Sequence, residues 1–441
     1  MTVNLDTKSI DGLGQEMYNL IAELYPICRS ITGNGVRQSL KILQQHIPLE
    51  MHEVPSGTPV FDWTVPKEWN IRNAYIKDET GKKIVDFQES NLHILNYSLP
   101  IHQKMPLSQL KEHLFSMPDR PDWIPYRTSY YNETWGFCLT DRTLQSLPEG
   151  DYEVYIDSSL EAGSLTYGEL FLPGQTEDEI FLFCHECHPS LCNDNLSGVA
   201  LVTFLAKYLS QQSLRYSYRF VFAPATIGAI TWLSQNENKV SRIKHGLTVA
   251  NVGDPGHLTY KKSRRGNADI DRVVPYVLKA SSQNYEIADF SPYGYDERQF
   301  CSPGFNLPVG SLTRSQFGTF PEYHTSADNL DFVQMSALVN SFETYLSVID
   351  ILENNQTYLN TNPKCEPQLG KRGLYSMYGG KQTAPSDRMA MLWTLNLSDG
   401  EHTLLDIAER SNLNFSVIKH AASNLENSGL LKVCSSSGDK G

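Results

Sequence analysis

The chain has 441 residues, of which 40% are apolar and 11% aromatic. This length predicts two or three domains, and the apolar content is enough for packed cores, which excludes a disordered chain. The 37 basic and 50 acidic side chains give a formal net charge of −13, which argues against a large surface for nucleic acid or anionic membrane.

The sequence also lacks the usual signals for export or membrane insertion. The N-terminal residues have neither the basic nor the apolar stretch of a signal peptide, and no apolar run approaches the roughly 18 residues of a transmembrane helix. Eight cysteines in a chain of this length do not make a disulfide framework. We therefore expect a cytoplasmic protein with reduced thiols and no membrane partner.

The first third of the chain predicts helices followed by β-structure. Residues 9–48 carry apolar side chains at helical spacing, which predicts two helices. Residues 57–150 contain short β-type runs separated by proline, glycine and charges, which predicts an inserted β-rich domain. These runs are Phe61–Val65, Ala74–Ile76, Lys83–Phe87 and His93–Tyr97. Tyr130 and Tyr131 lie in an aromatic segment of this region and suit either contact with a ligand or the core of a small domain.

From Asp151 onward, strand-like and helix-like segments alternate. This alternation predicts an α/β fold with a doubly wound, mostly parallel sheet. Residues 1–56 and 151–358 are assigned to this discontinuous domain. The expected strands are 152–156, 169–172, 180–184, 216–223, 246–252 and 307–311, and the expected helices are 196–209, 227–236, 270–283 and 332–354.

The C-terminal residues predict a small separate domain. Residues 356–385 are polar and suggest a linker, and residues 370–441 suggest a winged helix-turn-helix with three short helices and a strand. Its third helix offers only Lys419 and His420 as basic groups, fewer than DNA-reading helices usually carry. Packing or homo-oligomerisation is therefore favoured over binding to nucleic acid.

The richest chemical signal is FLFCHECHPSLCNDNLSG, residues 181–198, where an apolar strand ends at potential metal ligands. HECH is not the HExxH zinc motif, because its histidines are three residues apart at a strand end. A structural zinc on the three cysteines is disfavoured, since no second ligand pair follows. A hydrolytic metal site remains: a strand-end histidine with Asp194, completed by His324, leaving one open position for water.

These motifs carry a resemblance. HxCHPSxxNDNLSG is similar to the metal-binding turn of M28-type zinc aminopeptidases, and EYHTSAD, residues 322–328, is similar to the last ligand loop of that class. Nearly the whole chain resembles a bacterial aminopeptidase-like family with a DUF4910 peptidase-like domain, an inserted DUF2172 domain and a C-terminal winged helix, associated with polysaccharide biosynthesis. Further matching stretches are LYPICRSITGNGVR, SGTPVFDWTVPKEWNI, IPYRTSYYNETWGFC, VGDPG and YDERQFCSPGFNLPVGSL.

The resemblance implies one Zn²⁺ per chain, held by His188, Asp194 and His324. By strand-end geometry alone His185 is the better match, so it is kept as the alternative ligand. The substrate implied is a small peptide or an aminoacyl amide. Further candidates for the site are Tyr323 as a donor to the oxyanion, and Arg298 or Arg264 as a partner of a substrate carboxylate.

One position departs from the family pattern. Where the family has Pro-Glu-Thr-Ile-Gly-Ser, this chain has a stretch with Ala225 in place of the glutamate that is expected to act as general base. Loss of such a base typically lowers the rate ~10²–10⁴-fold. Ala225 is either an introduced change that inactivates the protein or the natural residue of a member that binds without hydrolysis, and Asp254 or Glu297 could supply another carboxylate. The sequence thus leaves three hypotheses for the function. The protein is a hydrolase without its expected base, a non-catalytic binding or assembly protein, or a ligand-sensing DNA-binding regulator.

Overall fold

The computed structural model describes residues 7–281, 283–374 and 385–434. The chain divides into two compact units, Asn4–Leu346 and the residues from Ser347 onward. None of the described helices is both long and apolar enough to cross a membrane.

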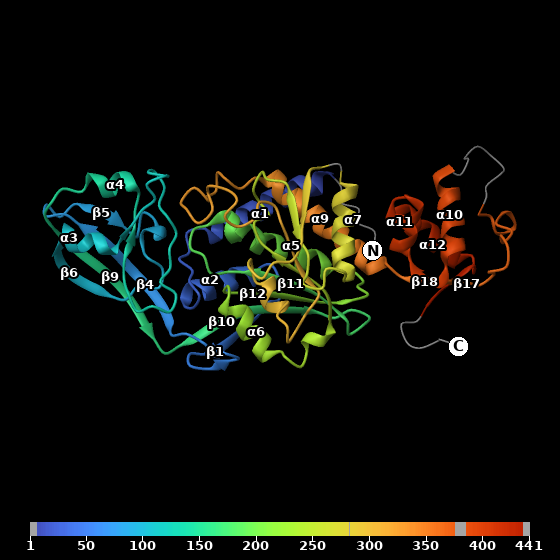
Figure 1. Cartoon of the computed structure of the whole chain (residues 1–441), viewed down its shortest axis with the longest axis horizontal. Helices are drawn as coiled ribbons and strands as arrows, with labels where there is room; N and C mark the ends of the chain where they lie inside the picture. Colours follow the sequence, from blue (N-terminus) through green and yellow to red (C-terminus); the bar gives the residue numbers. More distant parts are fainter. Residues whose placement is uncertain (1–6, 282, 375–384, 435–441) are drawn as a thin grey trace. The chain divides into compact units, whose positions relative to one another are not determined.

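The larger unit is built on an eight-stranded mixed sheet with strand order β1-β10-β12-β11-β13-β16-β14-β15 (Figure 1). The four central strands, β12, β11, β13 and β16, run parallel, and the pairs β1–β10, β10–β12 and β14–β16 are antiparallel. The bounds are β1 (Glu50–Pro55), β10 (Ser164–Leu172), β11 (Glu179–His185), β12 (Ser217–Ala223), β13 (Ile243–Val249), β14 (Leu258–Lys261), β15 (Tyr285–Ala288) and β16 (Val309–Thr313).

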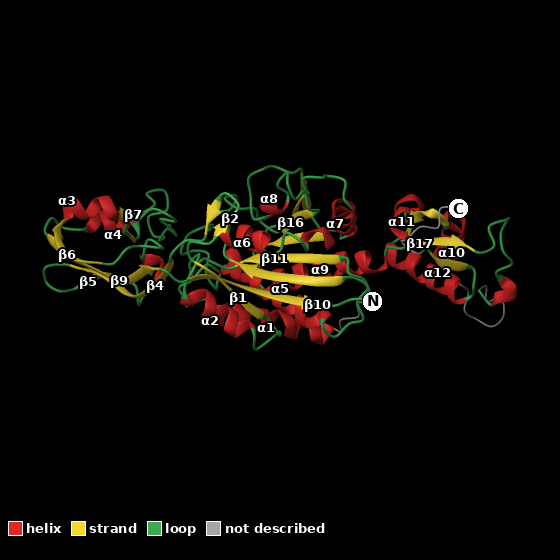
Figure 2. Ribbon diagram, turned by 90° about the horizontal axis from the view of Figure 1, so that it is seen from below, coloured by secondary structure: helices red, strands yellow, loops and turns green. Residues whose placement is uncertain are grey.

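Helices cover both faces of this sheet (Figure 2). One layer contains α1 (Thr7–Leu24), α2 (Asn34–Leu43), α5 (Gly198–Leu209) and α9 (Met335–Asn354), and the opposite layer contains α6 (Ile227–Gln235), α7 (Asp269–Ala280) and α8 (Glu297–Phe300). Every residue of β11 is buried, as expected for a central parallel strand enclosed by two layers. The predicted α/β class is confirmed, with a more mixed sheet than the alternation suggested.

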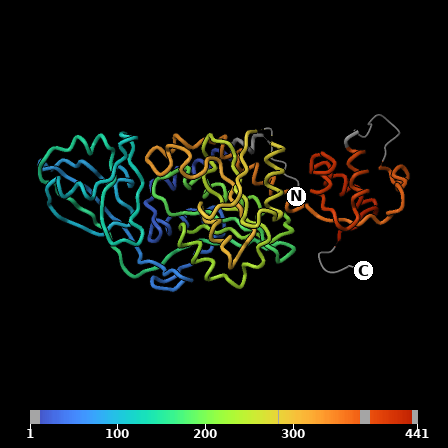
Figure 3. Tube along the Cα trace, in the orientation of Figure 1, coloured from blue at the N-terminus to red at the C-terminus, as the bar shows by residue number. Residues whose placement is uncertain are grey.

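The two ends of this unit's sequence meet in one helical layer. Tyr18 on α1 donates a hydrogen bond to the carbonyl oxygen of Leu330, 312 residues later, and α1 runs beside the start of α9 in the trace of Figure 3. The N-terminal helices, which have no strands of their own, are therefore part of the α/β layers.

A second, four-stranded antiparallel sheet lies within the same unit, in the order β5-β4-β9-β6. Its strands are β4 (Glu68–Lys77), β5 (Lys83–Asp86), β6 (Ile101–Pro106) and β9 (Asp151–Glu161). The smaller elements nearby are β2 (Pro59–Val60), β3 (Trp63–Thr64), α3 (Leu107–Leu110), β7 (Leu114–Phe115), β8 (Phe137–Cys138) and α4 (Asp141–Ser146).

Three of the predicted strands differ in the structure. The strand expected at 61–65 is reduced to Trp63–Thr64 of β3. The strand expected at 152–156 exists as β9, but it pairs with β4 and β6 in the second sheet and not with the α/β sheet. The strand expected at 93–97 does not form, because Asn96 donates its backbone N–H to Arg127 and its side-chain amide to Arg29 in an irregular loop. Hydrophobic pattern identifies a strand but not its partners.

The described residues of the C-terminal unit after α9 include the helices α10, α11 and α12 and an antiparallel sheet in the order β18-β17-β19. The elements are β17 (Thr357–Asn360), α10 (Pro385–Leu397), β18 (Asp399–Thr403), α11 (Leu404–Ser411), α12 (Phe415–Asn427) and β19 (Leu431–Val433). The linker prediction for 356–385 is wrong at its start, because β17 is the central strand of this sheet. Thr403 and Asp406 form a capping box that begins α11.

Candidate metal centre

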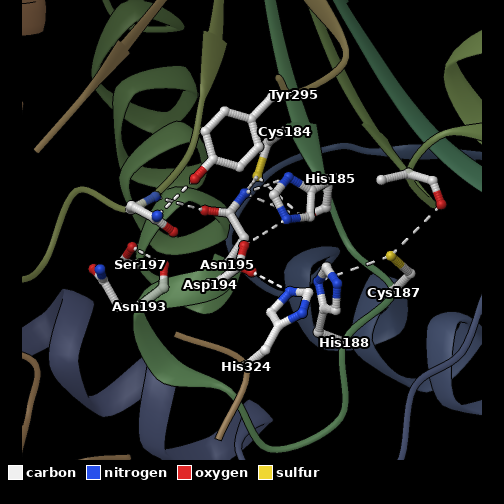
Figure 4. Close-up of polar contacts among 12 residues, drawn as sticks. Cys184, His185, Cys187, His188, Asn193, Asp194, Asn195, Ser197, Tyr295 and His324 are labelled. Atoms are coloured by element: carbon white, nitrogen blue, oxygen red, sulfur yellow. Dashed lines mark hydrogen bonds and ion pairs between the residues drawn. The ribbon is translucent and has the colours of Figure 1, made fainter. Parts of the chain in front are cut away.

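The centre of the site is the carboxylate of Asp194, which lies between two histidines (Figure 4). Nε2 of His185, at the end of β11, donates to Oδ1 at 2.8 Å, and Nε2 of His324 donates to Oδ2 at 2.9 Å. The Asp194 side chain is fully buried. Burial acts to raise the pKa of Asp194, but His188, His185 and His324 together hold this pKa well below its usual range.

His188 completes a group of three imidazoles around this carboxylate. The ligand atoms of His185, His188 and Asp194 lie within 4.8 Å of one another, and the ring centroids of His188 and His324 are 5.0 Å apart. Burial lowers the pKa of His188 to about 3, so its ring is neutral and has a lone pair to give.

This donor set fits a zinc ion. Nitrogen and oxygen ligands lie about 2 Å from Zn²⁺, so two ligands of one ion are roughly 4 Å apart or less. Donors that are already within 4.8 Å of one another need to move little to share an ion. Among the described residues this group contains no cysteine, which argues against the structural zinc-knuckle interpretation.

The turn that presents Asp194 is held by its two asparagine neighbours. Nδ2 of Asn195 donates to the carbonyl oxygen of Val249 at 2.9 Å, and the backbone N–H groups of Asn193 and Asp194 donate to the Asp328 carboxylate at 2.6 and 2.9 Å. A Cβ at Gly198 would lie 2.4 Å from Oδ1 of Asn195, so only glycine allows this close approach. The NDNLSG motif thus encodes the geometry of the turn as well as the ligand.

His324 is presented by a strained loop that contacts the aromatic segment 124–139. Its φ of 57° lies in the left-handed region, which non-glycine residues seldom adopt outside functional sites. The Tyr323 ring stacks on the His324 ring with centroids 3.9 Å apart, so Tyr323 lies at the centre as expected. Its pKa is raised, first by burial, so its hydroxyl keeps the proton that a donor needs.

Tyr126 is a site residue that sequence reasoning missed. Its backbone N–H donates to the carbonyl oxygen of His324 at 2.8 Å, and its ring stands perpendicular to the rings of His188 and His324 at 5.0 Å from each. Its position in the aromatic segment was the available signal. Tyr130 and Tyr131 are 48% and 46% exposed and stacked on each other, and the Tyr130 hydroxyl is close enough to interact electrostatically with Asp194.

Arg29 supports the histidine turn from the opposite side. Its guanidinium is buried, and it donates from Nε to the carbonyl oxygen of His188 at 2.9 Å and from Nη1 to that of Leu24 at 2.7 Å. Glu186 interacts electrostatically with this charge, without a direct hydrogen bond to it. Burial raises the pKa of Glu186 to about 8, against the opposing effect of Arg29.

The two arginine candidates differ in position. Nη2 of Arg298 donates to Oγ1 of Thr226 at 3.3 Å, which places this arginine beside Ala225. Arg264 is exposed, and its Nη1 donates to Oδ1 of Asn306 at 2.9 Å. The structure therefore brings Arg298 next to the position of the expected base, whereas the contacts of Arg264 are with another loop.

The two substitute carboxylates are already engaged. Asp254 accepts hydrogen bonds on both oxygens, from Asn193 at 2.9 Å and from Ser315 at 2.6 Å, and Glu297 pairs with Lys261 at 2.8 Å. Asp254 is therefore not free to replace a glutamate at position 225, whereas Glu297 is held by Lys261 through Oε1 and its Oε2 accepts no hydrogen bond from the described residues.

The fold and the site define a class: this is an α/β protein of the zinc-aminopeptidase fold with a C-terminal winged helix. The structure of a zinc aminopeptidase from Bacillus subtilis superposes with a TM-score of 0.56 at 11% identity, over 77% of this chain and 94% of that one. A winged helix-turn-helix family matches residues 356–433.

The domain-of-unknown-function family DUF4910 matches residues 18–355, and the chain belongs to this family. A Clostridium acetobutylicum protein, provisionally named a polysaccharide biosynthesis protein with an aminopeptidase-like domain, is 58% identical over 98% of this chain and 99% of its own. A crystal structure from Clostridium acetobutylicum, provisionally described as a peptidase, superposes with a TM-score of 0.92 at 56% identity, over 97% of this chain and 98% of that one.

Proposed function

We propose that this protein is a metal-dependent amide hydrolase of aminopeptidase type, which acts on a small peptide or aminoacyl amide within a biosynthetic pathway. The observation that carries the proposal is the buried Asp194 carboxylate with an imidazole on each oxygen and a third imidazole beside it. Such a set of buried donors costs folding free energy and suits a bound cation better than an apolar core.

His188, Asp194 and His324 are the proposed ligands of one Zn²⁺ per chain, with His185 as the alternative to His188. A zinc ion held there would act as a Lewis acid that polarises an amide carbonyl and lowers the pKa of a water. The Tyr323 hydroxyl would donate to the developing oxyanion, and Tyr130 and Tyr131 would border the substrate. Arg298, which already contacts Thr226, would orient a substrate carboxylate.

The proposed function can be tested by restoring a glutamate at position 225. Ala225 offers no proton acceptor, so a carboxylate restored there should raise the rate of any hydrolysis at this centre. We expect zinc-loaded Ala225→Glu protein to cleave at least one L-aminoacyl p-nitroanilide or dipeptide faster than the wild type, measured by release of nitroaniline or amine. If the zinc-loaded wild type and the zinc-loaded Ala225→Glu variant are both inactive on every such substrate, the proposed hydrolytic function is wrong.

The alternative is a non-catalytic binding or assembly protein that keeps the peptidase-like site for recognition. Ala225 is the specific observation in its favour. Under this alternative, both proteins bind zinc and an aminoacyl amide in isothermal titration calorimetry, yet neither releases product.

A further inference from the structure

Asp296 is an acidic side chain for which the function proposed above gives no role. It is 2% exposed, and neither carboxylate oxygen accepts a hydrogen bond within the described part of the chain. A buried carboxylate loses its hydration, and without a hydrogen bond the fold offsets that loss only through the nearby charges of His185 and Arg298. Such a group calls for an explanation, and one explanation is a partner that arrives with the substrate.

The neighbours of Asp296 place it at the metal centre. The preceding residue, Tyr295, stacks its ring on His185 with centroids 5.7 Å apart. Two residues further on, Arg298 donates to Thr226, the residue after Ala225. Asp296 therefore belongs to a short segment whose two neighbouring side chains contact the end of β11 and the start of α6. The charge of Asp296 also acts on His185, Cys187 and Tyr130, which border the centre.

The other buried acidic groups near the centre have structural partners. Asp328 accepts the N–H groups of the Asp194 turn, Asp254 accepts from Asn193 and Ser315, and Glu297 pairs with Lys261. Glu186 also lacks a hydrogen bond, but its nearby charge is Arg29, which supports the histidine turn from the opposite side. Among these carboxylates, Asp296 combines unpartnered oxygens with a position beside both His185 and Ala225.

We propose that Asp296 is the catalytic carboxylate of this site and does the work of the glutamate that position 225 lacks; this inference rests on the hydrolytic function proposed above. An oxygen of Asp296 accepts a proton from the attacking water while the water oxygen bonds to the amide carbonyl carbon. The carbon–nitrogen bond then breaks, and Asp296 returns the proton to the leaving nitrogen. The products are a carboxylic acid and an amine, and no further reactant is needed.

The test is a double-mutant cycle between positions 225 and 296. Wild type, Asp296→Asn, Ala225→Glu and the double variant are loaded with Zn²⁺, checked for equal zinc content and melting temperature, and assayed on a panel of L-aminoacyl p-nitroanilides. We expect Asp296→Asn to lower kcat of the wild type by ~10²–10⁴-fold with little change in KM. In the Ala225→Glu background the same substitution should cost far less, because the introduced glutamate then takes the proton.

Two further variants separate chemistry from folding. Asp289→Asn changes an exposed carboxylate of the same segment that pairs with Lys262, and should leave kcat unchanged. Asp296→Ala removes the carboxylate altogether, and added formate should restore part of its activity if a proton acceptor is all that is lost.

Each result distinguishes the inference from the proposed function. Equal losses from Asp296→Asn in both backgrounds would assign Asp296 a structural role and overturn the inference. Activity in Ala225→Glu with none in the wild type would overturn it as well, while the hydrolytic function stands. If the zinc-loaded wild type and the three zinc-loaded variants of the cycle are all inactive, the proposed hydrolytic function is wrong, and the inference about Asp296 falls with it.

Discussion

Nε2 of His324 lies 2.9 Å from Oδ2 of Asp194, a residue 130 positions earlier in the chain. This contact joins the NDNLSG turn after β11 to a loop near the end of the larger unit. Because the other oxygen of Asp194 contacts His185, one carboxylate orients two imidazoles toward a common point. A site of this kind forms only when the whole sheet is assembled.

Asp194→Asn should remove metal binding. The substitution keeps the shape of the side chain but takes away the negative charge that faces the histidines, so the affinity for Zn²⁺ should fall by at least ~100-fold. Isothermal titration calorimetry and metal analysis of the purified protein measure this. His102→Ala, which changes an exposed histidine on β6, is the control and should bind zinc as the wild type does. If Asp194→Asn binds Zn²⁺ with the affinity of the wild type, Asp194 is not a metal ligand and the proposed metal centre is wrong.

The roles of His185 and His188 can be separated by comparing two alanine variants. If His188 is a ligand and His185 orients Asp194, His188→Ala should lose stoichiometric zinc, and His185→Ala should retain it with ~10–100-fold weaker affinity. Metal analysis after gel filtration distinguishes the two. The opposite order would assign the ligand to His185.

Arg29→Met should destabilise the larger unit. The buried guanidinium donates to the carbonyl oxygens of His188 and Leu24, and its loss leaves both buried acceptors without this donor. A buried acceptor left without a donor typically costs about 1–3 kcal/mol. Urea unfolding of chelator-treated protein measures the free energy of unfolding.

Arg72→Met is the matched control for this prediction. Arg72 pairs with Asp157 at the surface, where solvent screens the pair, so its loss should change the free energy of unfolding little. If Arg29→Met and Arg72→Met lower the free energy of unfolding by similar amounts, the buried hydrogen bonds of Arg29 do not stabilise the larger unit.

Acid should weaken the junction between the two sheets of the larger unit. Hydrogen bonds from Arg37 lower the pKa of Glu68 on β4 from 4.5 to about 2. Because the folded-state pKa lies below the unfolded value, Glu68 stabilises the fold above pH 4.5, and this contribution is lost as the pH falls toward 2. Glu68→Gln should therefore be less stable than the wild type by roughly 1–2 kcal/mol at pH 7, after allowance for solvent screening, and about equal to it near pH 2.

Urea unfolding of the metal-free protein at several pH values checks the Glu68 prediction. A stability difference between wild type and Glu68→Gln that stays constant from about pH 7 to about pH 2 would rule out this linkage.

The winged helix should not bind duplex DNA. Lys419, one of the two basic groups on α12, has its Nζ 2.8 and 2.9 Å from the carboxylate oxygens of Asp350, so its charge is largely neutralised. No shift is expected in a gel-shift assay with random duplex DNA at low salt. A salt-dependent shift that Lys419→Ala weakens would revive the regulator hypothesis.

Much of the architecture was predictable from local pattern. The apolar run 180–184, the helical spacing after it and the β–α alternation identified most elements of the α/β sheet, because burial on both faces leaves a continuous apolar strand. Asp194 and His324 were recognisable because the motifs around them combine ligand residues with turn residues. The winged helix was recognisable from its three short helices and from the residues that cap them.

Other features depend on partners that periodicity does not encode. The pattern of β9 predicts a strand, yet only hydrogen bonds to β4 and β6 decide that it belongs to the second sheet. The sequence offers Asp254 and Glu297 as substitute carboxylates, but tertiary contacts engage both and leave the neighbouring Asp296 without a hydrogen-bond partner among the described residues. Local sequence therefore determined which elements and ligand types this chain has, whereas long-range packing decided which of its charges are neutralised and which remain free to act at the Asp194 centre.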